Sequence, residues 1–308
     1  MINYKKTILL TGAGFSKNFG GYLASEIWSK IFNNPDLEKL PLIKEKLRSN
    51  FDFESIYAEV LDNKDFSLKE KNDFQNIIIK AYVDMDDMLG QYSFTEQNTF
   101  QINIYGIREM LGLFAGSKPN EIGLHFTLNQ DLFMERKINR PALGLELLDY
   151  KHYRDAISSG RIDSSVRVNL PNHSFINNFK QNHLNSSGDL FYIKLHGSLG
   201  WYSAIAGNKK MVLGNNKLSD IMEEPLLKWY FEIFKEALLR DNVRFFIIGY
   251  GFNDKHINQV IAEAVIKHNL KIYIISPENP QYFRERLIHL PFSNKSTLRK
   301  FDKQGIEI

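Results

Sequence analysis

Long apolar runs that end in glycine or polar residues predict a parallel β-sheet. Four stretches show this pattern: "KKTILLTGAG", "GDLFYIKLHGS", "VRFFIIGYG" and "LKIYIIS", at residues 5–14, 188–198, 243–251 and 270–276. Strands that are apolar without alternation are typical of parallel sheets covered on both faces. Between the last two runs, Ile257, Val260, Ile261, Ala264 and Val265 recur at helical spacing. This strand–helix–strand order predicts an open parallel α/β sheet with helices on both faces.

The middle of the chain has a different pattern. Residues 36–114 contain helix-like segments at about 37–47, 53–61, 67–89 and 100–114, and little strand signal. The third begins "SLKE", with Ser67 and Glu70 at the spacing of a capping box. We expect a helical insertion at about 36–114 and a loop-rich insertion at about 141–187. Both would belong to a single domain of residues 1–308.

Composition narrows the class of protein. The chain has 308 residues, of which 43% are hydrophobic and 24% charged, and a net charge of +3, which is too small to favour nucleic-acid binding. It has no cysteine, which excludes disulfides, thiol nucleophiles and zinc–thiolate sites. Its apolar runs are far shorter than a membrane span, and the start of the chain has no signal-peptide hydrophobic region. We expect a cytoplasmic protein without membrane contact.

The first strand runs into a turn suited to binding phosphate. In "TGAGFSKNFGG", residues 11–21, Gly12 and Gly14 let the backbone approach a ligand, and a predicted helix at about 21–32 would face anions with its N-terminus. The dinucleotide fingerprint fails because Lys17 stands at its third glycine, and the P-loop lysine is missing. A strand–turn–helix junction without a ligand remains an alternative.

Polar residues follow three more predicted strands. "HFTLNQDLF" places Asn129 and Asp131 after a short apolar strand, and "IKLHGSLGW" places His196 after another. "IIGYGFNDKHIN" ends a third strand in a glycine turn, with Asn253 or Asp254 placed to cap the next helix. The carboxyl ends of parallel strands meet at the edge where open α/β sheets bind ligands.

In this order and spacing, the stretches resemble the sirtuin family. The matching residues are Gly12, Ala13, Gly14 and Ser16 for G-A-G-x-S, Thr127, Asn129 and Asp131 for T-x-N-x-D, and Leu195, His196, Gly197 and Ser198 for L-H-G-S. The resemblance covers about residues 7–280, apart from the two insertions. It implies a Rossmann-like fold that binds NAD⁺.

Departures from the family pattern indicate a particular branch. Deacetylating sirtuins carry Asp-Phe-Arg after the first motif, where this chain has "GYLASE", and Gln where Leu128 stands. They also hold a zinc ribbon on four cysteines, which this chain lacks. The chain is more similar to zinc-less sirtuin-like proteins of bacterial antiviral defence, many of which consume NAD⁺.

The resemblance implies a reaction and roles for residues. The reaction is cleavage of the nicotinamide–ribose bond of NAD⁺ to give nicotinamide and ADP-ribose or a cyclic form. His196 would be the base, because a neutral imidazole accepts a proton near pH 7. Asn129 would position the ribose and the attacking water, and Asp131 would contact the nicotinamide–ribose region or support the loop. Residues expected to bind the remainder of NAD⁺ are Gly12, Ala13, Gly14, Ser16, Thr127, Gly197 and Ser198, with Gly249, Gly251 and Ser276 on the adenosine side. No metal is expected.

Other interpretations of the same residues remain open. His196 could be a structural histidine, Asn129 a turn former, and Asp131 the cap of the helix "LFMER". Asp254 and His256 are interpreted as helix-start and packing residues. The protein could instead sense NAD⁺ or an ADP-ribose derivative without turnover, transfer ADP-ribose to protein, or remove acyl groups.

An enzyme that depletes NAD⁺ harms its own cell, so we expect its activity to be gated. The expected partners are NAD⁺, further copies of the chain in a homo-oligomer, and a defence-system protein such as an ATPase or a phage-sensing protein. The helical insertion at 36–114 is the expected interaction surface.

Overall fold

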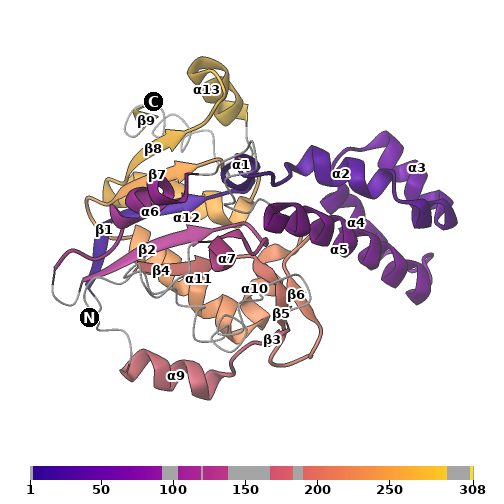
Figure 1. The fold of residues 1–308 in the computed structure, drawn as a ribbon, viewed down its shortest axis with the longest axis horizontal. Helices are drawn as coiled ribbons and strands as arrows, with labels where there is room; N and C mark the ends of the chain where they lie inside the picture. The colour runs from indigo at the N-terminus through magenta and orange to yellow at the C-terminus, as the bar shows by residue number, and fades with distance from the viewer. Residues whose placement is uncertain are drawn as a thin grey trace.

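A parallel sheet forms the centre of the protein (Figure 1). The computed structural model describes residues 3–91, 103–118, 121–137, 167–182, 190–289 and 306–307. In spatial order, the strands are β4 (Leu190–Lys194), β2 (Glu121–Thr127), β1 (Asn3–Thr11), β7 (Arg244–Ile248), β8 (Lys271–Ile275) and β9 (Ile306–Glu307), all parallel. The predicted Rossmann-like α/β fold is confirmed, and each of the four apolar runs forms a strand.

Strand β1 lies at the point where the direction of the chain through the sheet reverses. The chain passes from β1 to β2 on one side, and later places β7 on the other side of β1. Thr11, the last residue of β1, pairs with Thr127 of β2 and with Ile248 of β7. These strands therefore end level with one another, and the loops that follow them leave from one edge. In open α/β sheets a ligand binds in the crevice at such a point.

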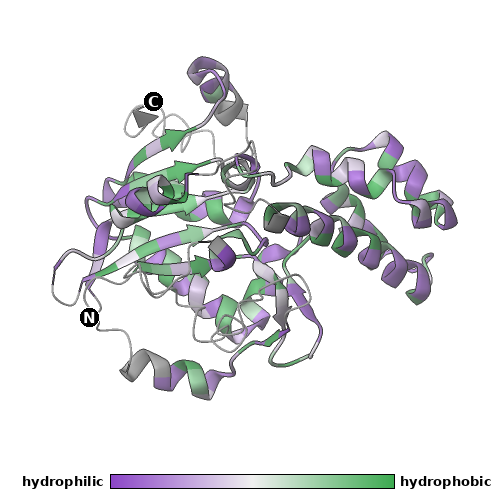
Figure 2. Ribbon diagram, in the orientation of Figure 1, coloured by the Kyte–Doolittle hydropathy of each residue, from purple (hydrophilic) through white to green (hydrophobic). Residues whose placement is uncertain are grey.

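Helices cover both faces of the sheet, and the strands between them are apolar (Figure 2). Ile8 and Leu10 of β1 pack in one core with α11 (Pro225–Leu238) and α12 (Lys255–His268). Leu9 points to the other core, which α6 (Ile104–Gly112) covers and where the rings of Phe114 and Phe246 meet. The C-terminal helix α13 (Pro280–His289) follows β8. In the described part of the chain, no helix is long and apolar enough to span a bilayer.

A group of helices, here called the helical lobe, lies beside the sheet (Figure 1). It consists of α2 (Ala24–Phe32), the 3₁₀ helix η1 (Pro35–Lys39), α3 (Pro41–Ser49), α4 (Phe53–Asp62) and α5 (Leu68–Gln91). The predicted capping box forms, because the N–H of Ser67 donates to Glu70 Oε2 at 2.8 Å and the N–H of Glu70 to Ser67 Oγ at 3.3 Å.

The lobe differs in extent from the expected insertion. Helix α2 packs against α5, so the lobe begins at Ala24, whereas α6 lies against the sheet instead of within the lobe. The expected second insertion at 141–187 falls largely outside the described residues. Its described part holds β3 (Val168–Asn169) and α9 (His173–Asn182).

A small second sheet was not predicted. It has the order β3-β5-β6, with β5 (Gly197–Tyr202) antiparallel to β6 (Lys209–Met211). The stretch after His196 is therefore a strand, although its glycine and serine residues are typical of a turn. Gly197 adopts a φ of +74°, a conformation that favours glycine. The chain thus turns from β4 into β5 at His196.

Candidate functional site

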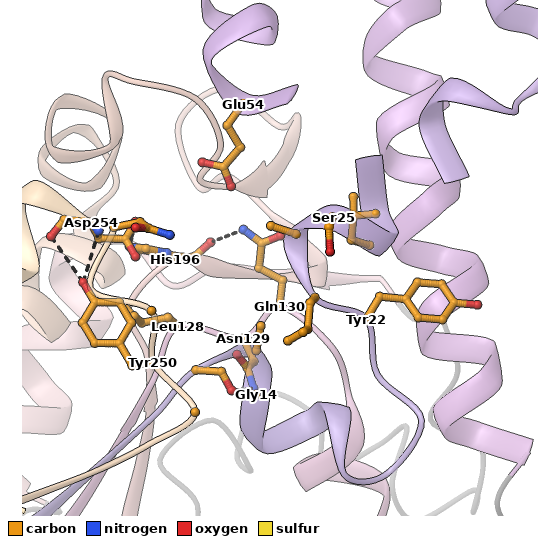
Figure 3. Close-up of a pocket in the computed structure, with 18 of the residues that line it drawn as sticks. Gly14, Tyr22, Ser25, Glu54, Leu128, Asn129, Gln130, His196, Tyr250 and Asp254 are labelled. Carbon is orange, nitrogen blue, oxygen red and sulfur yellow. Dashed lines mark hydrogen bonds and ion pairs between the residues drawn. The ribbon is translucent and has the colours of Figure 1, made fainter. Parts of the chain in front are cut away.

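A cavity of about 1060 Å³ lies between the carboxyl ends of the central strands and the helical lobe (Figure 3). This is at the upper end of the usual range for small-molecule sites, roughly 300–1,000 Å³. The predicted site residues that line it are Gly12, Ala13, Gly14, Ser16, Asn129, Asp131, His196, Gly249, Gly251 and Ser276. The structure therefore brings ten of the thirteen predicted residues to one place.

The two glycine turns pack against each other, backbone to backbone. The N–H of Gly12 donates to the oxygen of Ile248 at 3.0 Å, and that of Gly14 to the oxygen of Gly249 at 2.9 Å. These two N–H groups were expected to cradle phosphate, but they already have acceptors within the protein. The glycines serve mainly to let β1 and β7 continue into crossing turns, since a Cβ on Gly14 would come within 2.7 Å of the Cα of Gly249.

The helix after the first turn also differs from expectation. A five-residue helix, α1 (Ala13–Lys17), begins inside the turn with Gly12 as its N-cap. The predicted helix at about 21–32 begins only at Ala24, as part of the lobe. Because the first N–H groups of a helix have no intrahelical acceptor, Ala13 offers a backbone donor beside the cavity.

Asn129 and Asp131 hold the first turn in place. The amide group of Asn129 donates to the oxygen of Gly12 and to Ser16 Oγ, each at 2.9 Å. Ser16 Oγ in turn donates to Asp131 Oδ2 at 2.8 Å. Both amide hydrogens of Asn129 are thus used, which leaves its oxygen to accept a hydrogen bond from a ligand. The Ser16 hydroxyl, expected to bind phosphate, is likewise engaged within the protein.

Asp131 also caps a short helix. Its Oδ1 accepts from the N–H of Phe133 at 3.0 Å, at the start of α7 (Phe133–Lys137). The carboxylate is buried and joins α1 to α7. These contacts agree with the supporting and capping interpretations of Asp131.

Three predicted residues do not line the cavity: Thr127, Gly197 and Ser198. Thr127 is buried within the sheet, where its hydroxyl accepts from Thr11 Oγ1 at 2.9 Å. Ser198 is buried as well, and its Oγ accepts from Lys194 Nζ at 3.0 Å. A Cβ on Gly197 would lie 2.1 Å from the oxygen of Lys210. All three stabilise the strands around the site.

His196 is paired with a second histidine. Its Nε2 lies 3.0 Å from Nε2 of His256, so the N–H of one ring donates a hydrogen bond to the nitrogen of the other. His196 Nε2 also lies 3.9 Å from Asp254 Oδ1. Asp254 stands at the N-cap of α12, but its side chain makes no capping bond, and its N–H donates to the Tyr250 hydroxyl at 3.2 Å (Figure 3). The interpretation of Asp254 and His256 as helix-start and packing residues was therefore incomplete, since both face the cavity.

A lysine connects this group to the helical lobe. Lys217 Nζ, at the start of α10 (Lys217–Glu223), lies 2.8 Å from Asp254 Oδ1 and 2.6 Å from Glu54 Oε2 on α4. All three side chains line the cavity. The ion pairs therefore join the lobe to the edge of the sheet directly beside the two histidines.

Burial controls the protonation of the histidine pair. It lowers the pKa of His196 to about 3 and that of His256 to about 4, with Asp254 acting in the opposite direction on both. Burial alone would raise the pKa of Asp254, but the neighbouring imidazoles and Lys217 outweigh it and hold that pKa at about 2. Near pH 7 the site therefore holds two neutral imidazoles beside an ionised carboxylate.

Sequence reasoning missed several cavity residues. Asp254 and His256 carried a signal, because they follow a glycine turn at the carboxyl end of a strand. Glu54 and Lys217 carried none, since neither lies in a motif or next to a strand end. Gln130, between two predicted residues, donates to the oxygen of Val212 at 3.0 Å and of His196 at 3.4 Å, which fixes the turn at His196 (Figure 3).

Comparison with known families agrees with this architecture. Residues 124–299 match the sequence model of the SIR2-like domain, which covers more than half of the chain. The match includes Asn129, His196 and His256 but not the opening glycine turn. No curated protein matches the chain significantly. A Rossmann-like sheet and a family match over strands β4 to β8 lead to one conclusion: the chain belongs to the SIR2-like family.

Proposed function

We propose that the protein is an NAD⁺ glycohydrolase that cleaves the nicotinamide–ribose bond and releases nicotinamide and ADP-ribose or its cyclic form. The observation that carries this proposal is the meeting of the glycine turn, Asn129 and His196 at one large cavity. Membership of the SIR2-like family supports an NAD-related activity.

The reaction requires the protein mainly to position NAD⁺ and the attacking nucleophile. Nicotinamide leaves NAD⁺ as a neutral molecule through an oxocarbenium-like transition state, so its departure needs no general acid. The oxygen of Asn129 is available to accept from a ribose hydroxyl or from water. His196 is neutral at pH 7, so it can accept a proton from the attacking nucleophile, although its lowered pKa makes it a weak base. The Asp254 carboxylate, 3.9 Å from His196 Nε2, would stabilise the imidazolium that forms.

The charges around His196 also suit a cationic transition state. Asp254 and Glu54 are two carboxylates paired with one ammonium, that of Lys217. Burial raises the pKa of Glu54, although Lys217 acts in the opposite direction. Where both carboxylates are ionised, the group has a net charge of −1. A negative charge beside the ribose would stabilise the positively charged, oxocarbenium-like transition state more than an apolar pocket would.

A second function, binding of NAD⁺ or an ADP-ribose derivative without turnover, is favoured by one observation. His196 Nε2 is already hydrogen-bonded to His256, and both amide hydrogens of Asn129 are engaged within the protein. A sensor would keep these contacts when it binds. An enzyme has to exchange at least one of them for a contact to the substrate.

We further propose that the enzyme acts as a gated effector of bacterial anti-phage defence and assembles as a homo-oligomer. The helical lobe carries large apolar side chains that are exposed: Leu42, Phe51, Leu61 and Leu68. Exposed apolar side chains of this kind favour contact with another protein surface. A partner such as an ATPase or a phage-sensing protein would act on the same lobe.

A time course of purified protein with NAD⁺ tests the proposed reaction. We expect stoichiometric release of nicotinamide and ADP-ribose, or the cyclic product, over time. A sensor would instead raise its melting temperature with NAD⁺ and release no nicotinamide. Mass analysis of proteins in the same reaction would reveal ADP-ribosyl transfer or loss of acyl groups, and either result would replace hydrolysis.

A further inference from the structure

The cluster of His196, Asp254 and His256 has the composition of a metal site. One nitrogen from each imidazole and one carboxylate oxygen all lie within 4.8 Å of one another. The Nε2 atoms of the histidines are 3.0 Å apart, and Asp254 Oδ1 lies 3.9 Å from His196 Nε2. Two atoms that bind the same zinc ion at about 2.0–2.2 Å lie at most a little over 4 Å apart, so these two separations suit a shared ion. The remaining pair, His256 and Asp254, lies within 4.8 Å and needs at most a small side-chain adjustment.

From this geometry, we propose that the cluster binds one divalent transition-metal ion of the zinc class at the edge of the cavity. Two imidazoles and a carboxylate are a ligand set that zinc uses at sites with an open fourth position. All three residues line the cavity, so the open position faces the space where a ligand or water enters.

The surroundings of the cluster agree with such an ion. The two Nε2 atoms lie against each other, and a neutral imidazole presents a lone pair to a metal ion there. The direct contact between the two Nε2 atoms holds only one proton, and a metal ion would take its place.

Lys217 opposes the ion but does not exclude it. Its ammonium lies 2.8 Å from Asp254 Oδ1 and therefore competes for the carboxylate. Glu54 offsets this charge at 2.6 Å from the same ammonium. The Asp254 carboxylate is therefore not neutralised by Lys217 alone, because Glu54 shares the same ammonium.

An ion in this position would affect the reaction. It would take the lone pair of His196 that the proposed base role requires, so zinc would inhibit turnover. This consequence rests on the proposed function, whereas binding of the ion does not.

Zinc binding to the chelator-treated protein tests the proposal. Competition against a chromophoric chelator should show one Zn²⁺ per chain, with affinity at least about 10-fold lower in folded His256→Gln. His268→Gln is the matched control, because His268 lies on the same helix, is outside the cavity and should bind Zn²⁺ as the parent does. Lys217→Met should bind Zn²⁺ more tightly, since it removes the competing cation. If His256→Gln does not fold, His196→Gln serves the same purpose.

Two results would overturn the site. One is equal Zn²⁺ affinity in the parent and the folded histidine variant, and the other is weaker binding in Lys217→Met. Nicotinamide release in the presence of Zn²⁺ is measured separately. A protein that binds Zn²⁺ but never releases nicotinamide would contradict the proposed function and leave the metal site supported.

Discussion

Gly14 and Gly249 pack against each other so closely that neither position has room for a side chain. The N–H of Gly14 donates to the oxygen of Gly249 at 2.9 Å, and a Cβ built on Gly249 would lie 2.3 Å from the nitrogen of Phe15. Gly249 also has a φ of +66°, which other residues rarely adopt. This contact holds the ends of β1 and β7 together beneath the cavity.

We therefore expect alanine at either glycine to destabilise the fold. Overpacking of this kind costs about 1–3 kcal/mol, and Gly249→Ala should cost more because of its backbone conformation. The free energy of unfolding in urea measures both. Gly112→Ala is the control, because a Cβ there meets nothing within 4 Å. If Gly14→Ala is as stable as the control, the close packing of the two turns is wrong.

Loss of Lys217 should weaken the connection between the helical lobe and the sheet. Lys217→Met leaves Glu54 and Asp254 without their shared cation. Because the three side chains are partly buried, the cost should lie between that of a surface pair and the about 3–5 kcal/mol of a fully buried pair. Lys267→Met removes an exposed pair with Glu263 and should cost at most about 1 kcal/mol. Thermal or urea unfolding of both variants gives the comparison. Equal losses would show that the partly buried ion pairs of Lys217 contribute no more than a surface pair.

The stability of the protein should fall in mild acid because of His125. This side chain is fully buried, and burial lowers its pKa from 6.5 to about 3. The unfolded chain binds a proton near pH 6.5 that the folded chain binds only near pH 3. Stability from this residue is therefore complete above pH 6.5 and is lost as pH falls, by about 2 kcal/mol at pH 5.

A matched pair of variants isolates this effect. Unfolding of the parent and of His125→Gln is compared at pH 7 and pH 5, and the contributions of His196 and His256 are present in both proteins. The difference in stability between them should shrink by about 2 kcal/mol at pH 5. A difference that stays constant with pH would contradict a neutral, buried His125.

Turnover per chain should rise with protein concentration if the enzyme is gated by assembly. Leu42 and Leu68 of the helical lobe are 67% and 75% exposed, so an aspartate there should not disturb the core. Leu42→Asp and Leu68→Asp should remain folded, shift the protein to smaller species in size-exclusion chromatography and lower nicotinamide release. Full turnover by a monomer, independent of concentration, would exclude this form of gating.

The sequence predicted the parts of the fold that local patterns determine. Apolar runs such as that around Leu9 mark strands buried on both faces, and residues that follow them, such as Asn129 and His196, must lie at one edge of a parallel sheet. It did not predict the hydrogen bond from the N–H of Gly14 to the oxygen of Gly249, because that bond depends on how two turns distant in the sequence cross. The position of Lys217 likewise depends on contacts between segments far apart in the chain.

Nicotinamide release by His196→Ala is the most direct test of the central claim, that the cavity cleaves NAD⁺ with His196 as base. Asn129→Ala should lower turnover too, but it also loosens the turn at Gly12 and weakens NAD⁺ binding by a few-fold, about the value of one hydrogen bond. His196→Ala should keep NAD⁺ binding and release nicotinamide roughly 10²–10⁴-fold more slowly, the range typical of a lost general base. Release at the parental rate by the folded His196→Ala protein would contradict the account.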